Sequence, residues 1–235
     1  MRGALFFDVV GTLVDWRAGV ARAAREALAP RGVTLDWLAF ADDWRARYQP
    51  TMEAVRSGAR PFAVLDALHR ENVAPVLARH GVRDPDDALL DELTLAWRRL
   101  DAWPDVAPAL ARLRPHYWLA PVSNGNVALM AGLARRNGFV WDAILGAEHA
   151  RDYKPKPEVY LAAARAFDLP PERCMMVAAH SNDLVAAAAC GLRTAHVARP
   201  DEHGPGRGET APSCPVDHAA RDLSDLADRL GCPPT

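Results

Sequence analysis

Residues 4–12 read Ala4-Leu-Phe-Phe-Asp8-Val-Val-Gly-Thr12, an apolar run interrupted by one acid and closed by a Gly-Thr pair. Aromatic and β-branched residues in a run of this length are typical of a strand buried on both faces of a parallel sheet, and we expect it to span Ala4–Val10. Asp8 falls near the carboxyl end of this strand, where open α/β sheets bind their ligands. Because an unpaired buried carboxylate is costly, Asp8 is a candidate functional residue.

The rest of the chain shows two patterns. Residues 16–100 carry apolar side chains at helical spacing with no convincing strand, whereas strand and helix patterns alternate from residue 101 onward. Alternation predicts a doubly wound parallel α/β sheet with a Rossmann-like core, and the helical block is then an all-helical cap inserted after the first strand. We therefore expect a core of residues 1–15 and 101–235 and a cap of residues 16–100. The later strands are expected at 117–122, 143–145, 175–179 and 194–197.

Residues 200–216 are rich in proline and glycine. A loop that cradles phosphate needs a strand directly before it and a helix directly after it. The next helical pattern begins only near Ala219, so these residues are expected to form an exposed loop.

The composition excludes several classes of protein. Half of the 235 residues are hydrophobic and 25% are charged, which is typical of a globular chain. The formal charge of −2 provides no general field for nucleic acid or an anionic membrane. No apolar run approaches the ~20 residues of a membrane span, and the N-terminal stretch lacks signal-peptide features, so a cytoplasmic protein is expected. The four cysteines form no CxxC pair and are expected to be reduced thiols.

Polar residues also follow the later strands. Three further segments do so: Ser123-Asn124-Gly125, Lys154-Pro155-Lys156-Pro157, and His180-Ser181-Asn182-Asp183. Carboxyl ends of parallel strands meet at one edge of a sheet, so these segments and Asp8 are expected to converge on one crevice.

Lys154 and Lys156 are the chain's only lysines, and the other basic residues are all arginine. A chain that uses arginine everywhere else and places both lysines in one short segment favours a requirement for a compact ammonium there. Chance is the alternative explanation.

The order of the four motifs resembles the haloacid dehalogenase-like superfamily, over essentially the whole chain. Members of that family carry Asp-x-Asp-x-Thr, then a Ser or Thr after the second strand, a Lys, and an acidic pair. The helical block matches the family's cap in position and size.

Two departures from the family's phosphatases point to the chemistry. Val10 stands where the phosphatases have a second Asp as general acid, and Ala179 stands where they have the first carboxylate of the acidic pair. A site reduced to Asp8 and Asp183 is a poor magnesium site, because Mg²⁺ requires oxygen ligands in near-octahedral geometry. An alkoxide leaving group also needs a proton that valine cannot supply.

Displacement of a halide needs neither the metal nor the acid, since halide leaves as a stable anion. The motifs are most similar to those of the type II 2-haloacid dehalogenases: Asp-x-x-Gly-Thr, Ser-Asn-Gly and Lys-Pro-x-x-x-x-Tyr, with Tyr160 at the matching position. The resemblance implies a metal-independent, cofactor-free hydrolase of short 2-haloacids that forms an aspartyl ester. Its partners are the haloacid and water, and a homodimer is one possible assembly.

The resemblance also implies roles for the residues of these motifs. Asp8 attacks the carbon that bears the halogen, and Lys154, rather than Lys156, keeps Asp8 ionised by lowering its pKa. Asp183 orients or deprotonates the water that hydrolyses the ester.

Five further residues are expected at the site. Thr12 and Ser123 hydrogen-bond the Asp8 carboxylate or the substrate carboxylate, and Asn124 cradles the departing halide. His180 is a second base, a substrate contact or a structural histidine. Asn182 replaces a bulkier residue common in the family, so this wall of the pocket differs.

Family members also bind the halide or the substrate carboxylate with a cap arginine. No tight motif locates it here, and Arg47 and Arg56 are the expected candidates. Tyr48, Phe62 and Trp44 either line the pocket or belong to the core.

Two other functions are open at this point. One is a magnesium-dependent small-molecule phosphatase of the same superfamily, which Val10 and Ala179 argue against. The other is a binding module without catalysis, which the intact Asp8, Lys154 and Asp183 argue against.

Overall fold

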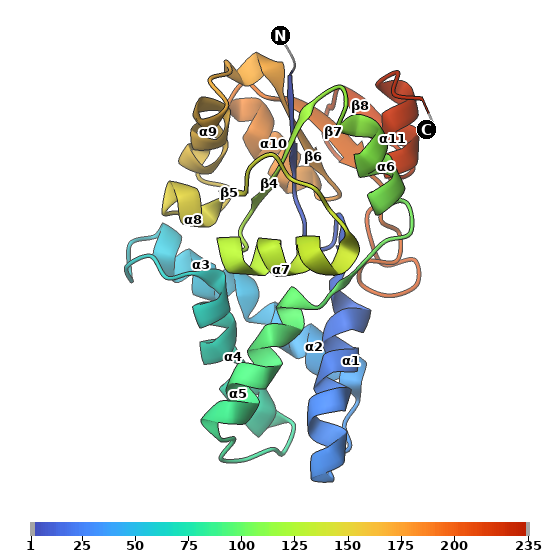
Figure 1. The fold of residues 1–235 in the computed structure, drawn as a ribbon. Helices are drawn as coiled ribbons and strands as arrows, with labels where there is room; N and C mark the ends of the chain where they lie inside the picture. Colours follow the sequence, from blue (N-terminus) through green and yellow to red (C-terminus); the bar gives the residue numbers. More distant parts are fainter. Residues whose placement is uncertain (1–2, 234–235) are drawn as a thin grey trace.

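A parallel sheet of six strands forms the upper part of the molecule in the computed structural model, which describes residues 3–233 (Figure 1). The strand order is β5-β4-β1-β6-β7-β8, and every neighbouring pair is parallel. The expected α/β fold with a parallel sheet is therefore confirmed. The strands are β1 Ala4–Phe7, β4 Trp118–Ser123, β5 Leu145–Gly146, β6 Cys174–Ala178, β7 Arg193–Val197 and β8 His218–Ala220.

Strand β1 is central, and its side chains alternate between two buried faces. Leu5 and Phe7 pack into a core with α6 (Val106–Leu113), α7 (Val127–Asn137) and α11 (Leu223–Arg229). Ala4 and Phe6 pack on the other face with α9 (Pro157–Ala166) and α10 (Ser181–Ala189). Because both faces are covered, the strand is continuously apolar. The short helix α8 (Ala147–Ala150) and the 3-10 turn η3 (Pro171–Arg173) complete this part of the chain.

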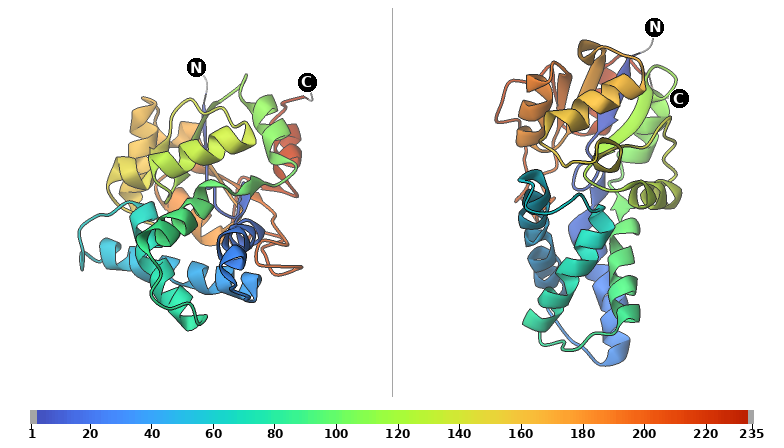
Figure 2. Two further views of the ribbon diagram at one scale, coloured as in Figure 1. Left: turned by 60° about the horizontal axis from the view of Figure 1, so that its bottom comes forward. Right: turned by 90° about the vertical axis from the view of Figure 1, so that its left-hand side faces the viewer.

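A lobe of helices is inserted between two short strands, β2 (Val14–Asp15) and β3 (Asp101–Ala102). These strands pair antiparallel, so the chain leaves the sheet and returns to it through a two-stranded neck. The right-hand view of Figure 2 shows the helical lobe stacked end to end with the sheet. Its elements are α1 Trp16–Leu28, η1 Ala29–Arg31, α2 Trp37–Ala46, α3 Tyr48–Arg56, α4 Leu65–Arg79, α5 Asp87–Thr94 and η2 Leu95–Arg98.

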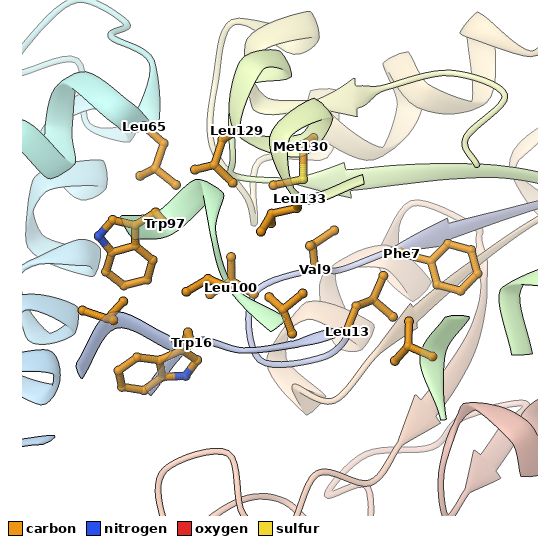
Figure 3. Close-up of a cluster of buried hydrophobic side chains, with 14 of the residues drawn as sticks. Phe7, Val9, Leu13, Trp16, Leu65, Trp97, Leu100, Leu129, Met130 and Leu133 are labelled. Atoms are coloured by element: carbon orange, nitrogen blue, oxygen red, sulfur yellow. The ribbon is translucent and has the colours of Figure 1, made fainter. Parts of the chain in front are cut away.

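One hydrophobic cluster joins the helical lobe to the sheet (Figure 3). Trp16 and Trp97 from the helical lobe meet Leu129 and Leu133 of α7 in that cluster, and all four side chains are buried. Asp15 caps α1 at this junction by accepting a hydrogen bond from the Ala18 backbone at 3.0 Å. The continuous packing holds the lobe against the carboxyl edge of the sheet.

The structure corrects two details of the expected elements. Strand β1 ends at Phe7 rather than Val10, because the chain turns there: Leu13 N donates to Val9 O, and Gly11 N donates to Val14 O. Residues 218–220 form strand β8 rather than the start of a helix, and the helix begins only at Leu223. Across residues 3–233, no helix has both the length and the apolar character to cross a membrane.

Candidate active site

The four predicted segments meet at the carboxyl edge of the sheet, which faces the helical lobe (Figure 1). Asp8 directly follows β1, Asn124 follows β4, and His180 and Asp183 lie at the start of α10 after β6. Lys154 lies in the loop between α8 and α9, and its backbone N–H donates to Asn124 Oδ1 at 2.8 Å. The crevice therefore forms where the sheet topology predicts it.

A buried chain of charged groups runs across this crevice. Lys154 Nζ lies 3.0 Å from Asp8 Oδ1 and 2.6 Å from Asp183 Oδ2, and Tyr160 Oη donates to Asp183 Oδ1 at 2.5 Å. The Lys154 side chain is 6% exposed, so its charge is shielded from bulk water. Burial lowers the pKa of Lys154, but the two carboxylates raise it by more, and the ammonium stays charged.

The pKa values of Asp8 and Asp183 are shifted in opposite directions. Burial alone would raise the pKa of Asp8, but Lys154, His180 and Thr12 outweigh it and hold that pKa well below its usual range. For Asp183, burial and the repulsion of Asp8 outweigh Lys154 and Tyr160, so its pKa is raised. Asp8 is thus the carboxylate that is kept ionised, which a nucleophile requires.

The second oxygen of Asp8 is also held. Thr12 Oγ1 donates to Asp8 Oδ2 at 2.7 Å and accepts from the Ala179 backbone at 2.9 Å. His180 Nδ1 lies 3.0 Å from the same Asp8 oxygen. Both carboxylate oxygens are therefore oriented by charged or polar neighbours.

Glu202 is a buried residue of the site that the sequence reading missed. Its carboxylate lies 2.9 Å from His180 Nε2 and accepts from Trp16 Nε1 at 3.1 Å, and it is 2% exposed. Burial lowers the pKa of His180, but bonds to Asp8 and Glu202 outweigh it and raise that pKa to about 10. His180 is consequently an imidazolium at neutral pH. The expectation that residues 200–216 form only an exposed loop is wrong at this position.

The crevice encloses a cavity of about 270 Å³ between the sheet and the helical lobe. Arg45 and Tyr48 face it from α2 and α3, and the Arg45 guanidinium stacks 3.9 Å from the centre of the Tyr48 ring. Within residues 3–233, the buried Arg45 Nε has no hydrogen-bond partner. The cavity is lined by Asp8, Val10, Arg45, Tyr48, Gln49, Asn124, Lys154, Pro155, Tyr160, His180, Asn182 and Asp183.

Four expected site residues lie outside this lining, and one of them, Thr12, still donates to Asp8 from below the surface of the cavity. Arg47 is exposed. Arg56 donates to the Lys154 carbonyl at 2.8 Å, so it links the helical lobe to the loop that carries Lys154. The structure replaces both with Arg45 as the arginine that faces the cavity. Ser123 is buried, and its hydroxyl accepts from the Gly125 backbone at 3.1 Å instead of reaching Asp8. Of the aromatic candidates, Tyr48 faces the cavity, whereas Phe62 packs on Tyr153 and Trp44 is core.

The residues present do not fit a magnesium ion. The Lys154 ammonium lies between Asp8 and Asp183 and already pairs with both carboxylates. Apolar Val10 and Ala179 supply no further oxygen ligand. Residues 3–233 contain no cluster of three or more His, Cys, Asp or Glu side chains with the arrangement of a metal site.

Comparison with known families decides which fold family this site belongs to. A family model described as haloacid dehalogenase-like hydrolase matches residues 3–191. The chain belongs to the haloacid dehalogenase-like hydrolases. The expected resemblance is confirmed, and the chain is a hydrolase of this type.

Individual members of the family match along nearly the whole chain. The solved structure of a defluorinating L-2-haloacid dehalogenase is 45% identical, with a TM-score of 0.95, and the match covers 98% of this chain and 95% of that one. An (S)-2-haloacid dehalogenase 4A of Burkholderia cepacia is 29% identical over 95% of this chain and 92% of its own. Phosphoglycolate phosphatase 1 of Pseudomonas aeruginosa is 26% identical over 96% of this chain and 79% of its own.

Proposed function

We propose that this hydrolase cleaves the carbon–halogen bond of a short 2-haloacid through an ester on Asp8, without a metal. The observation that carries the proposal is the Lys154 ammonium bonded to both Asp8 and Asp183. It keeps Asp8 ionised as a nucleophile and pairs with one oxygen of each carboxylate. The haloacid dehalogenases among the relatives support the same reaction.

The cavity supports a small anionic substrate. Its volume of about 270 Å³ lies below the ~300–1,000 Å³ of pockets for drug-sized ligands. Arg45 faces this space with an unpartnered Nε, so its guanidinium is available to the substrate carboxylate or to the halide as it leaves. Asn124 lines the same space and adds an amide donor. Asp8 and the Arg45 guanidinium both line this space, which suits a displacement in which negative charge moves from the attacking oxygen to the halide.

Halide release is expected to be independent of divalent metal. Excess EDTA should leave the initial rate of chloride release from L-2-chloropropionate unchanged, because Lys154 supplies the positive charge beside Asp8. Phosphate release from an aryl phosphate, assayed in parallel with and without Mg²⁺, should stay at background. A rate that EDTA removes and Mg²⁺ restores would instead support the phosphatase function.

Arg45 and Arg47 form a matched pair for locating the substrate anion. Arg45→Ala should lower kcat/KM by about 10²–10³-fold, the usual effect of removing a donor aimed at developing charge. Arg47→Ala, two residues along the chain and exposed, should keep the wild-type value. Steady-state kinetics with 2-chloropropionate measure both, and equal losses in the two variants would contradict the placement of Arg45.

A further inference from the structure

The buried pair of His180 and Glu202 has a geometry that the proposed attack by Asp8 does not by itself explain. His180 bridges two carboxylates: Nδ1 lies 3.0 Å from Asp8 Oδ2, and Nε2 lies 2.9 Å from Glu202 Oε2. Glu202 comes from the loop after β7, far along the chain from Asp8. A carboxylate at 2% exposure is costly unless it is paired, so the loop carries this residue for a specific contact.

Several features of the chain hold Glu202 in that place. Trp16 Nε1 donates to Glu202 Oε1 at 3.1 Å, and Arg199 in the same loop donates to the Thr12 carbonyl at 2.7 Å. Gly11 has φ +94°, and a Cβ built there would lie 2.2 Å from Glu202 Oε1. Glycine at position 11 therefore permits both the turn after Asp8 and the close approach of the carboxylate. The loop is fastened to the nucleophile segment rather than resting loosely on it.

We propose that His180, oriented by Glu202, is the general base that activates water to hydrolyse the Asp8 ester. The assignment rests on the proposed function, since it requires that ester to form. Glu202 is a positioning residue, because it acts through His180 and lies behind it. The arrangement of carboxylate, imidazole and reacting group is one that general bases require.

Formation of the ester itself switches His180 from acid to base. In the resting site two carboxylates hold the imidazole protonated, with Nδ1–H and Nε2–H donating to Asp8 and Glu202. Alkylation of Asp8 removes one of those two charges, and burial then favours the neutral ring. Glu202 retains the Nε2 proton, which leaves the Nδ1 lone pair directed at the ester. The base is thus created only after the nucleophile has reacted.

The charged and titratable groups near His180 come from several elements of the chain. Asp8 and Glu202 contact the ring directly. His203 lies 3.7 Å from Glu202, and His196 of β7 lies 3.6 Å from Glu209. The remaining nearby charges act through these contacts: Arg45 on Glu202, Lys154 on Asp8, and Glu209 through Ser181.

The proposed steps balance in atoms and charge. An Asp8 oxygen bonds to C2 as the carbon–halogen bond breaks, and the halide leaves with the electron pair. The Nδ1 proton passes to solvent. Water then attacks the ester carbonyl carbon and gives one proton to Nδ1. His180 delivers this proton to the hydroxy-acid oxygen when the bond between the Asp8 carboxyl carbon and that oxygen breaks. The carboxyl proton left on Asp8 returns to His180, so the net products are hydroxy acid, halide and one proton.

Asp183, the expected base, is less free to do this. Its two oxygens are held by Lys154 at 2.6 Å and by Tyr160 at 2.5 Å. Lys154 pairs with both Asp8 and Asp183 in the resting site. Once Asp8 is esterified, Asp183 is the one of these two that still carries a negative charge, so the ammonium further stabilises the ionised form of Asp183. The same event that frees the Nδ1 lone pair of His180 removes the repulsion that raises the pKa of Asp183, so Asp183 becomes a weaker proton acceptor.

Rapid-quench single turnover with L-2-chloropropionate separates the two half-reactions. His180→Gln and the near-isosteric Glu202→Gln should still release about one chloride per site, because Lys154 and Thr12 continue to hold the Asp8 carboxylate ionised. Ester hydrolysis should then fall by about 10²–10⁴-fold for His180→Gln, the usual contribution of a general base, and less for Glu202→Gln. Intact-mass measurement should show the propionyl adduct accumulating on both variants. His203→Gln, which alters an exposed imidazole near the same carboxylate, should accumulate no adduct.

A pH profile tests the positioning role of Glu202. Hydrolysis of the preformed ester should quicken with pH as His180 loses its proton, and Glu202→Gln should move that rise to lower pH because the stabilising anion is gone. Variants that hydrolyse the ester at the wild-type rate, or that lose chloride release together with turnover, overturn the assignment alone. Wild-type protein that forms no ester overturns the proposed function as well. Each measurement is made on the wild type, His180→Gln and Glu202→Gln, so the misfolding of a single variant does not determine the conclusion.

Discussion

Asp8→Asn is expected to abolish halide release. An amide is not a nucleophile, and without the ester neither half of the reaction can proceed. The neutral side chain also leaves the Lys154 ammonium with one carboxylate partner, Asp183, in a buried site. Initial-rate measurement of chloride release by the variant and the wild type checks this result.

Isotope labelling identifies the atom that attacks. In single turnover in heavy-oxygen water, an ester on Asp8 requires the label to enter the Asp8 carboxylate, while the first hydroxy acid formed carries an unlabelled oxygen from the enzyme. Peptide mass analysis of the Asp8 segment and mass analysis of the product measure the two positions. Label found directly in the first product, with none in the protein, would mean that water itself displaces the halide.

Sequence alone predicts the residues that directly follow apolar strands. Asp8, Asn124 and Asp183 each come within a few residues of a buried run, and parallel topology brings such positions to one edge. Lys154 is predicted separately, because lysine is rare in this chain. The fold follows from the same strand pattern, since a strand continuous in apolar residues must be covered on both faces.

Arg45 and Glu202 are not predictable in this way, because long-range packing brings them to the site. Arg45 lies near the end of α2 and is one of 26 arginines of the chain, and no feature of the sequence distinguishes it from Arg47. Glu202 lies in a segment whose proline and glycine content suggests solvent exposure. The requirement for glycine at position 11 becomes visible only when the Glu202 carboxylate is seen beside it.

Substitution of Lys154 is expected to have the second large effect on turnover. Lys154→Ala should reduce turnover by several orders of magnitude, because without the ammonium burial raises the pKa of Asp8 and a protonated carboxyl cannot attack carbon. Removing one partner of a buried ion pair also destabilises the fold, typically by about 3–5 kcal/mol. A thermal-unfolding measurement beside the halide assay therefore keeps loss of stability apart from loss of chemistry.

Arginine substitutions make this expectation specific to the ammonium. Lys154 Nζ sits between two carboxylates at 3.0 and 2.6 Å in a side chain that is 6% exposed, and a planar guanidinium is too wide for that space. Lys154→Arg should thus also lose most halide release. Lys156 is half-buried at the start of α9 and does not line the cavity, so Lys156→Arg should retain the wild-type rate. Equal initial rates for the two arginine variants would show that positive charge alone, and not its compact form at position 154, holds Asp8 ionised.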